Sequence, residues 1–349
     1  MRVERIEPGR PVPARLIGAV LTRDVAVAGA RWSKGRRLSA ADLEMLASSE
    51  AGDATVRAGL AATGAAGFSV LVLDPDDVHE DEAGRRLARA VAGANLTLRG
   101  PVQSRVDLVA TTAGVARIAT AALERIDRID PLEVFTVFDG QVVQPGDLVA
   151  SVKIAPHAVP ESTLARAEAL AARAGPLVTV APFLRRRVGI VVKESVPSAA
   201  RQRFERTIRS KVESLGSTIV SIAYVDDTPD AIGAALAALV RDPESADLIL
   251  TAGAASTDPS DSVFVAIHAL GGRVVRRGVP AHPGSMLWLA RLRHSAILGL
   301  PTCGAYSKAT AADLLLPRLL AGEPPTLATV ARLGHGGILS RDMRFRFPP

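Results

Sequence analysis

The sequence has little sulfur and few aromatic rings. Its one cysteine, Cys303, excludes an internal disulfide and any zinc site built from several cysteines, which is typical of proteins from a reducing compartment. Aromatic residues make up 3% of the chain, so alanine, valine, leucine and isoleucine must fill its cores. The same scarcity argues against the aromatic platforms on which proteins stack single-stranded nucleic acid.

Long hydrophobic runs are also missing. No uninterrupted apolar run reaches the roughly 18 residues that a membrane-spanning helix needs. The opening residues, MRVERIEPGR, lack the apolar stretch of a signal peptide. With 349 residues, 48% apolar and 22% charged, the composition is that of a globular protein of two or three domains. We therefore expect a cytoplasmic protein that does not contact the membrane.

The net charge of +6 raises the question of nucleic acid binding. In the most basic stretch, residues 201–211, apolar side chains recur at helical spacing, so the basic residues form the solvated face of an amphipathic helix. A basic RNA-binding protein stays an alternative that salt-sensitive binding would reveal, but charges scattered along the chain do not favour it. A smaller anionic ligand also suits this charge balance.

The C-terminal half alternates between short apolar strands and amphipathic helices. Strands are predicted at 187–192, 217–224, 247–252 and 294–301, and helices at 197–216, 228–240, 258–272 and 304–322. This alternation predicts an α/β domain over 186–325 in which helices cover both faces of a mostly parallel sheet, a three-layer arrangement. Such sheets bind ligands at the carboxyl ends of their strands.

Residues 1–180 have a mixed pattern that predicts an α+β region, which could comprise two lobes, and residues 326–349 form a C-terminal tail. Strands are expected in 18–29 and 134–154, where Asp139-Gly140 is a hairpin signal. Helices are expected at 39–50, 76–93, 111–126 and 161–175, the last joining the two halves.

The third strand of the C-terminal half runs directly into a turn of small residues, Thr251–Ser256. Such a turn exposes consecutive main-chain N–H groups at a helix N-terminus, where the helix dipole adds about half a positive charge and favours anions. Asp258 and Asp261 follow within one helical turn. They could hold Mg²⁺ against a phosphate, or they could form a capping box with Asp258 as the N-cap.

Five segments in the right order resemble the molybdopterin-binding domain shared by molybdopterin molybdenumtransferase, molybdopterin adenylyltransferase and gephyrin. The resemblance covers residues of roughly 186–322. It is carried by the strand start Val188-Gly189-Ile190, Asp226 before the second helix, the turn Thr251–Ser256 with Asp261, Pro283-Gly284-Ser285-Met286, and Gly299-Leu300-Pro301-Thr302-Cys303-Gly304. The chain departs from the family at Ala254, at Ser285 in place of lysine, and at Val192-Lys193-Glu194-Ser195 after the first strand.

The resemblance implies a molybdopterin or molybdenum-cofactor binding protein that acts in cofactor biosynthesis or in delivery to a molybdoenzyme client. The ligand would be molybdopterin or adenylated molybdopterin, with Mg²⁺ as a possible helper. By matched position, Asp226 and Asp261 would be the catalytic and metal-binding acids. The pterin would contact Thr251, Gly253, Ala254, Ala255, Ser256, Gly284, Ser285, Pro301 and Thr302.

Catalysis and a carrier role stay open, because transfer chemistry would release AMP from the adenylated pterin and a carrier would not. The alternative function is a Mg²⁺-dependent hydrolase of nucleotide derivatives resembling competence-damage-inducible protein A. A homo-oligomer is expected, with a dimer favoured from the insertases of the family.

Three further groups could carry chemistry. The acidic run from Asp74 to Glu82, which includes His79, could bind a hard metal, but acids in a first turn also complement the helix dipole; His79 and Glu80 could also face a partner subunit's pterin site. Arg99 and Arg105 could clamp a phosphate, or they could flank an ordinary polar turn. His282 could replace the missing lysine as a phosphate partner.

Overall fold

A computed structural model describes residues 1–27, 29–48, 55–58, 61–63, 67–193, 198–241, 243, 245–253, 257–300 and 309–346. The chain forms two compact units. The first comprises residues 1–110, 118–137 and 147–179, and the second comprises residues 111–117, 138–146 and 180–349. None of the helices in these ranges combines the length and hydropathy needed to cross a membrane.

The second unit is built on a six-stranded sheet with the order β18-β17-β19-β22-β21-β20. Its parallel part consists of β17 (Arg187–Val192), β18 (Thr218–Tyr224), β19 (Leu248–Ala252) and β22 (Ser295–Leu300). The edge strands β21 (Trp288–Leu292) and β20 (Arg273–Arg277) pair antiparallel. The parallel strands end side by side, so the loops that follow β17, β18 and β19 meet at one edge of the sheet.

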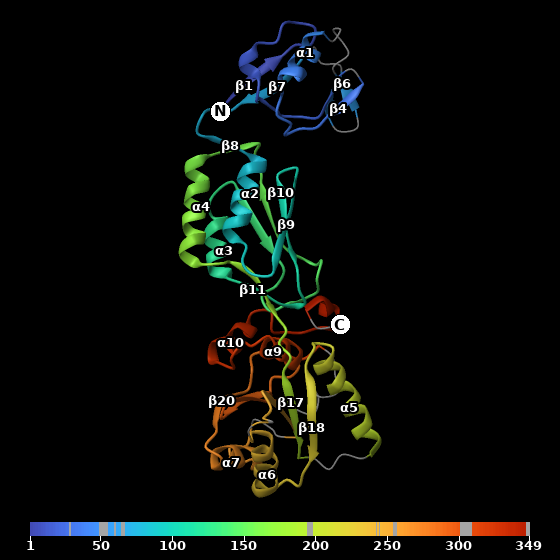
Figure 1. Cartoon of the computed structure of the whole chain (residues 1–349), viewed down its shortest axis with the longest axis vertical. Coiled ribbons are helices and arrows are strands. Elements are labelled where there is room, and N and C mark those ends of the chain that lie inside the picture. The colour runs from blue at the N-terminus through green and yellow to red at the C-terminus, as the bar shows by residue number, and fades with distance from the viewer. Residues whose placement is uncertain are drawn as a thin grey trace. The chain divides into compact units, whose positions relative to one another are not determined.

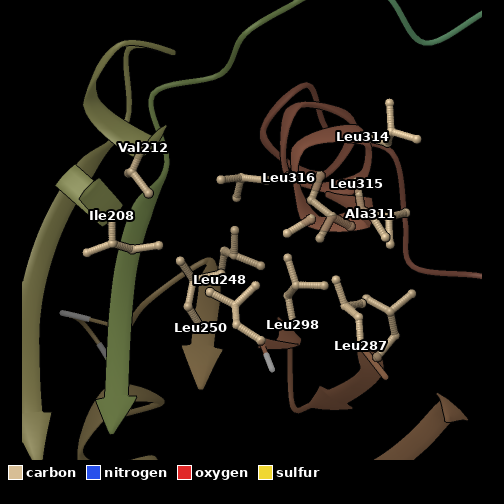
Figure 2. Close-up of a cluster of buried hydrophobic side chains, with 14 of the residues drawn as sticks. Ile208, Val212, Leu248, Leu250, Leu287, Leu298, Ala311, Leu314, Leu315 and Leu316 are labelled. Carbon is tan, nitrogen blue, oxygen red and sulfur yellow. The ribbon is translucent and has the colours of Figure 1, made fainter. Parts of the chain in front are cut away.

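Helices cover both faces of this sheet. Leu248 and Leu250 of β19 point toward α5 (Ser198–Glu213) and α9 (Ala311–Leu320), as Figure 2 shows. Ile249, between them, packs on the opposite face among side chains of α6 (Pro229–Leu239) and α7 (Ser262–Ala269). Because side chains alternate along a strand, a strand with apolar residues on both faces needs two covering layers. The predicted three-layer, mostly parallel α/β fold is confirmed (Figure 1).

Shorter elements complete the second unit. A three-stranded sheet has the order β13-β11-β16, formed by β13 (Val142–Val143), β11 (Gly114–Ile118) and β16 (Val178–Pro182). The C-terminal residues form α10 (Leu327–Ala331) and two 3₁₀ helices, η2 (Arg332–Gly334) and η3 (Arg341–Arg346).

The first unit is α+β, as the sequence predicted. Its sheets have the orders β1-β7-β2, β4-β3-β5-β6, β12-β14-β10-β9 and β15-β8. The strands are β1 (Arg2–Ile6), β2 (Val20–Leu21), β3 (Val25–Val27), β4 (Ala30–Trp32), β5 (Thr55–Ala58), β6 (Ala61–Thr63), β7 (Phe68–Val72), β8 (Asp77–His79), β9 (Leu96–Val102), β10 (Arg105–Ala110), β12 (Leu132–Thr136), β14 (Leu148–Ile154) and β15 (Ala158–Pro160). The helices are η1 (Ala14–Leu16), α1 (Ala40–Ser48), α2 (Glu80–Val91), α3 (Thr120–Asp127) and α4 (Glu161–Ala174).

Two local predictions in the N-terminal half are wrong. Residues 111–126 are not one helix, because their first part is the mostly buried strand β11 and only α3 is helical. The turn at Asp139-Gly140 does not join a hairpin of adjacent strands. The strand before it, β12, pairs with β14, while β13 pairs with β11, so the intervening chain leaves one sheet to join another.

Two partly or fully buried histidines of the first unit have pKa values shifted in opposite directions. His157 Nδ1 lies 2.9 Å from Glu80 Oε1, and its Nε2 lies 3.4 Å from the carbonyl oxygen of Thr22. The hydrogen bond with Glu80 raises the pKa of His157 above its ordinary value of 6.5, although burial and the charge of Lys34 oppose the shift. In contrast, burial lowers the pKa of His79.

We expect replacement of His157 by glutamine to destabilise the protein more at about pH 6 than at about pH 9. A raised pKa in the folded state means that the protonated histidine stabilises the fold fully below its unfolded pKa. That contribution is lost as the pH rises through the folded pKa. Chemical denaturation of the wild type and the variant at both pH values measures the effect. An equal loss of unfolding free energy at the two values would refute it.

Candidate functional site

The carboxyl ends of three adjacent strands are bound together by main-chain hydrogen bonds. Lys193, the first residue after β17, donates its N–H to the carbonyl oxygen of Ala252 at the end of β19 over 3.1 Å. Val225, after β18, donates to Val192 over 2.9 Å. The backbone therefore places the first residues beyond each strand next to one another, where a doubly covered parallel sheet binds its ligands.

The side chain of Lys193 lies at the centre of a polar cluster formed by these loops. Its Nζ is 2.8 Å from Asp261 Oδ2, 3.1 and 3.3 Å from the two carboxylate oxygens of Asp227, and 3.4 Å from Ser262 Oγ. The Ser262 hydroxyl donates a hydrogen bond to Asp227 Oδ1. The side chains of Lys193 and Asp261 are each 9% exposed, whereas that of Asp227 is 57% exposed, so the cluster opens to solvent at Asp227.

Charge pairing sets the protonation of this cluster. Burial lowers the pKa of the Lys193 ammonium, but its hydrogen bonds to Asp261 and Asp227 outweigh burial and raise the pKa above the ordinary value of 10.5. The hydrogen bond from Ser262 and the contact with Lys193 lower the pKa of Asp227. The lysine is therefore a permanent cation at neutral pH, and Asp227 is a permanent anion.

Asp261 also begins helix α7. It is the N-cap, and its Oδ1 accepts a hydrogen bond of 3.0 Å from the N–H of Val263. The predicted capping box with Asp258 as the N-cap is wrong. The Asp258 carboxylate instead accepts from the N–H of Ser260 over 2.8 Å, which forms a local turn before the helix.

Two buried polar atoms of the six-stranded sheet have no hydrogen-bond partner among the described residues. These are Thr251 Oγ1, near the end of β19, and Trp288 Nε1. Thr251 pairs with Gly299, which in turn pairs with Trp288, so the three residues occupy one row across the sheet. A buried hydroxyl without a partner is uncommon and costs about 1–3 kcal/mol. The Thr251 hydroxyl is therefore a candidate ligand contact in the second-last residue of β19.

The glycines of the predicted site have specific structural roles. Gly253, directly after β19, has φ +100°, in the left-handed region that glycine tolerates and other residues resist. Gly284 has φ +104°, and a Cβ there would lie 2.9 Å from the main-chain nitrogen of Ala311. The loop of Gly284 therefore packs against the first turn of α9. The carbonyl oxygen of Ser285 accepts from Val279 over 2.9 Å.

Several predicted contact residues lie outside the described part of the chain. They are Ala254, Ala255, Ser256, Pro301 and Thr302, together with Cys303. Of the predicted acids, Asp261 joins the Lys193 cluster. Asp226 is exposed, and its carbonyl oxygen accepts a hydrogen bond from the N–H of Thr228. The acid that the structure brings to the cluster is Asp227.

The predicted magnesium site does not fit the contacts that the structure shows. Both oxygens of Asp261 are already bonded, one to the helix N-terminus and one to Lys193. Within the described ranges, no three histidine, cysteine, aspartate or glutamate side chains are grouped so that they could hold a metal ion. The assignment of Asp226 and Asp261 to Mg²⁺ stays a prediction that these contacts do not support.

The other sequence candidates have local structural partners. His79 is the N-cap of α2, where its ring nitrogen accepts from the N–H of Asp81. Asp74 and Asp77 pair with the N-terminal amine of Met1. Arg99 and Arg105 flank a hairpin turn and both pair with Asp107.

His282 takes part in a main-chain pairing. Its N–H donates to Gly337 over 2.7 Å, and its carbonyl oxygen accepts from Leu339 over 2.8 Å. The loop that contains His282 is thus held to the C-terminal residues by its backbone.

Sequence reasoning assigned no role to Lys193, Asp227 or Ser262. A usable signal was present, because Lys193 follows a wholly apolar run directly and thus marks the edge where the loops converge. The sequence pattern does not distinguish Asp226 from Asp227, since the two acids are adjacent. Only the path of the loop decides which of them contacts Lys193.

Fold and site together define an α/β domain with a polar cluster and a glycine turn at the carboxyl edge of its parallel strands. Residues 188–321 match the family described as "Probable molybdopterin binding domain". This part of the chain is thus a divergent member of the molybdopterin-binding domain family, which is related to molybdenum cofactor biosynthesis.

Solved structures of proteins from molybdopterin and molybdenum cofactor biosynthesis are similar to the chain at low identity. The "molybdopterin biosynthesis moea protein" from Pyrococcus horikosii is 14% identical, with 74% of this chain and 81% of that one covered and a TM-score of 0.32. The "Molybdopterin biosynthesis enzyme MoaB" from Thermus thermophilus is 24% identical, with 40% and 98% covered and a TM-score of 0.28. A "putative molybdenum cofactor biosynthesis protein" from Corynebacterium diphtheriae is 12% identical, with 44% and 99% covered and a TM-score of 0.26. The comparison with curated proteins found no match.

Proposed function

We propose that the protein binds molybdopterin, or its adenylated form, and acts in biosynthesis of the molybdenum cofactor or in its delivery to a molybdoenzyme. The family match over residues 188–321 is the observation that carries this proposal. The match coincides with the domain in which β17, β18 and β19 end side by side, so the family resemblance and the expected ligand edge fall on the same part of the chain.

The ligand's anionic group is assigned to the turn after β19. Gly253 turns the chain with a left-handed φ, and no side chain at that residue obstructs the approach of a ligand. Helix α7 begins further on, at Ser262, and its N-terminus already holds the Asp261 carboxylate, so the anion is assigned to the turn and not to the helix. The buried Thr251 hydroxyl supports the proposal, because none of the described residues is its hydrogen-bond partner and a ligand could supply one.

Pterin content tests the proposal directly. The protein is purified from a host with an intact molybdopterin pathway and from a matched host without it, and both samples are oxidised with acidic iodine. We expect fluorescent oxidised pterin in near-stoichiometric amount from the first sample and none from the second. Equal signals, or no pterin in either sample after incubation with molybdopterin, would contradict the proposed function. Release of AMP from the adenylated pterin would show an enzyme, and retention of the intact ligand would show a carrier.

Replacement of Gly253 by alanine is expected to lower pterin affinity at least about tenfold, which corresponds to about 1.4 kcal/mol. The change adds a methyl group at the turn and forces a non-glycine residue to φ +100°. Gly216→Ala is the matched control. Gly216 also has a left-handed φ, +79°, and nothing lies within 4 Å of its added Cβ, so it reports the cost of strain alone. Equal pterin binding by the two variants would argue against the turn as the ligand site.

A further inference from the structure

The Lys193 ammonium has the surroundings that a metal ion would otherwise have. Oxygen atoms of three side chains, Asp261, Asp227 and Ser262, lie between 2.8 and 3.4 Å from its Nζ. Carboxylate and hydroxyl oxygens are the ligands that hard divalent cations prefer. Asp227 comes from the loop after β18, and Asp261 and Ser262 come from the start of α7. Lys193 follows β17, which lies between β18 and β19 in the sheet.

We propose that Lys193 is the built-in cation of this site and that the domain therefore binds its anionic ligand without magnesium. The proposal rests on the proposed function for the identity of the ligand, but its metal part concerns the ligand-free protein.

A divalent cation would have to displace the ammonium from Asp261, whose side chain is buried and whose other oxygen caps α7. The displaced ammonium would then stay close to the incoming ion, because the backbone of Lys193 is fixed to Ala252. Two like charges at such a distance repel strongly where water is partly excluded. Sequestration of the two carboxylates by lysine thus works against metal binding.

The charge balance also places the ligand. One ammonium and two carboxylates leave the cluster of Lys193, Asp227 and Asp261 with one net negative charge. A phosphate gains nothing from contact with that charge. The anion is therefore expected outside the cluster, which positions the start of α7 through Asp261, the cap of that helix.

The test is a titration of the ligand-free protein with Mn²⁺, a spectroscopic substitute for Mg²⁺, in which free Mn²⁺ is followed by electron paramagnetic resonance. We compare the wild type with Lys193→Met, Lys193→Gln and the double variant Lys193→Met/Asp261→Asn. Lys153→Met, at an exposed lysine of the first unit, is the matched control. Thermal unfolding establishes that each variant is folded.

We expect the wild type and Lys153→Met to bind Mn²⁺ only weakly. Lys193→Met and Lys193→Gln should each bind one Mn²⁺ at least tenfold more tightly than the wild type, and the added Asp261→Asn should abolish this gain. Wild-type protein that binds one Mn²⁺ as tightly as the Lys193 variants would overturn the proposal. Folded Lys193 variants that gain no site would overturn it too, because the ammonium would then not occupy a cation position. Neither result depends on pterin, so failure of the proposed function is recognised separately by the pterin assay.

Discussion

Replacing Arg318 by methionine is expected to lower the free energy of unfolding of the second unit by about 3–5 kcal/mol. Arg318 is 3% exposed and lies in α9. Its Nη2 donates to the carbonyl oxygen and the carboxylate of Asp139 over 3.0 and 2.8 Å, and its Nη1 donates to Glu323 over 3.1 Å. Methionine matches much of the apolar volume but leaves these partly buried acceptors without that donor.

Arg209→Met is the matched control, because it removes an ion pair of the same type from a solvated helix face. Arg209 pairs with Glu213 over 3.1 Å, and the two side chains are 46% and 49% exposed. Exposed pairs of this kind contribute at most about 0.5 kcal/mol. Denaturant titration of both variants measures the difference. Similar losses for the two would show that the contacts of Arg318 do not hold α9 to the 138–146 segment.

Replacing Gly299 by alanine is expected to destabilise the protein by about 1–3 kcal/mol. Gly299 lies in β22 beneath the indole of Trp288, and an added Cβ would come closer than 3.0 Å to ring atoms of that residue. The indole cannot easily move, because Trp288 is fully buried and packs edge-to-face on Phe264 with ring centroids 4.9 Å apart. A single methyl group therefore overpacks the row that contains Thr251.

Gly233→Ala is the control for this substitution. Gly233 lies inside helix α6, and its added Cβ would meet Ala266 at 3.9 Å, an ordinary contact. Alanine is better than glycine in a helix interior by about 1 kcal/mol, so this variant should be stabilised. Gly299→Ala should cost less unfolding free energy when it is added to Trp288→Leu than when it is added to the wild type, because leucine leaves room for the methyl group. If Gly299→Ala is as stable as the wild type, the indole does not occupy the position described.

The architecture of the C-terminal half was predictable from its pattern because local and tertiary signals agree there. The apolar runs that became β17, β19 and β22 are short, and amphipathic helices separate them. Thr228 caps α6 through its side chain, with Pro229 in the first turn, so local signals mark the start of the helix predicted over 228–240. Parallel strands that are buried on both faces have nearly continuous apolar sequences, so such short apolar runs predict these strands.

The N-terminal half was less predictable because its strands pair with distant partners. Residues 114–118 have side chains compatible with a helix, and only pairing with β13 and β16 makes them the strand β11. The glycine turn at 139–140 has the local chemistry of a hairpin, yet β12 pairs with β14. Tertiary pairing overrides local propensity in both segments.

The polar cluster of the site could be predicted only in outline. The sequence placed charged residues after β17 and β18 and an acid before α7. It could not show that the Lys193 ammonium reaches both Asp227 and Asp261, because that contact depends on three loops meeting at one edge. A resemblance that matches acids by position predicts a metal at Asp226 and Asp261, whereas the contacts that the structure shows join Lys193 to Asp227 and Asp261.

A crystal structure with bound molybdopterin tests most directly whether the turn after β19 holds the anionic group of a pterin. We expect pterin density at the carboxyl edge of β17, β18 and β19, with the phosphate on the main-chain amides that follow Gly253 and the Lys193 ammonium still on Asp261. Ligand density elsewhere on the protein, with this turn filled by the chain's own side chains, would contradict the assignment of the ligand to this turn.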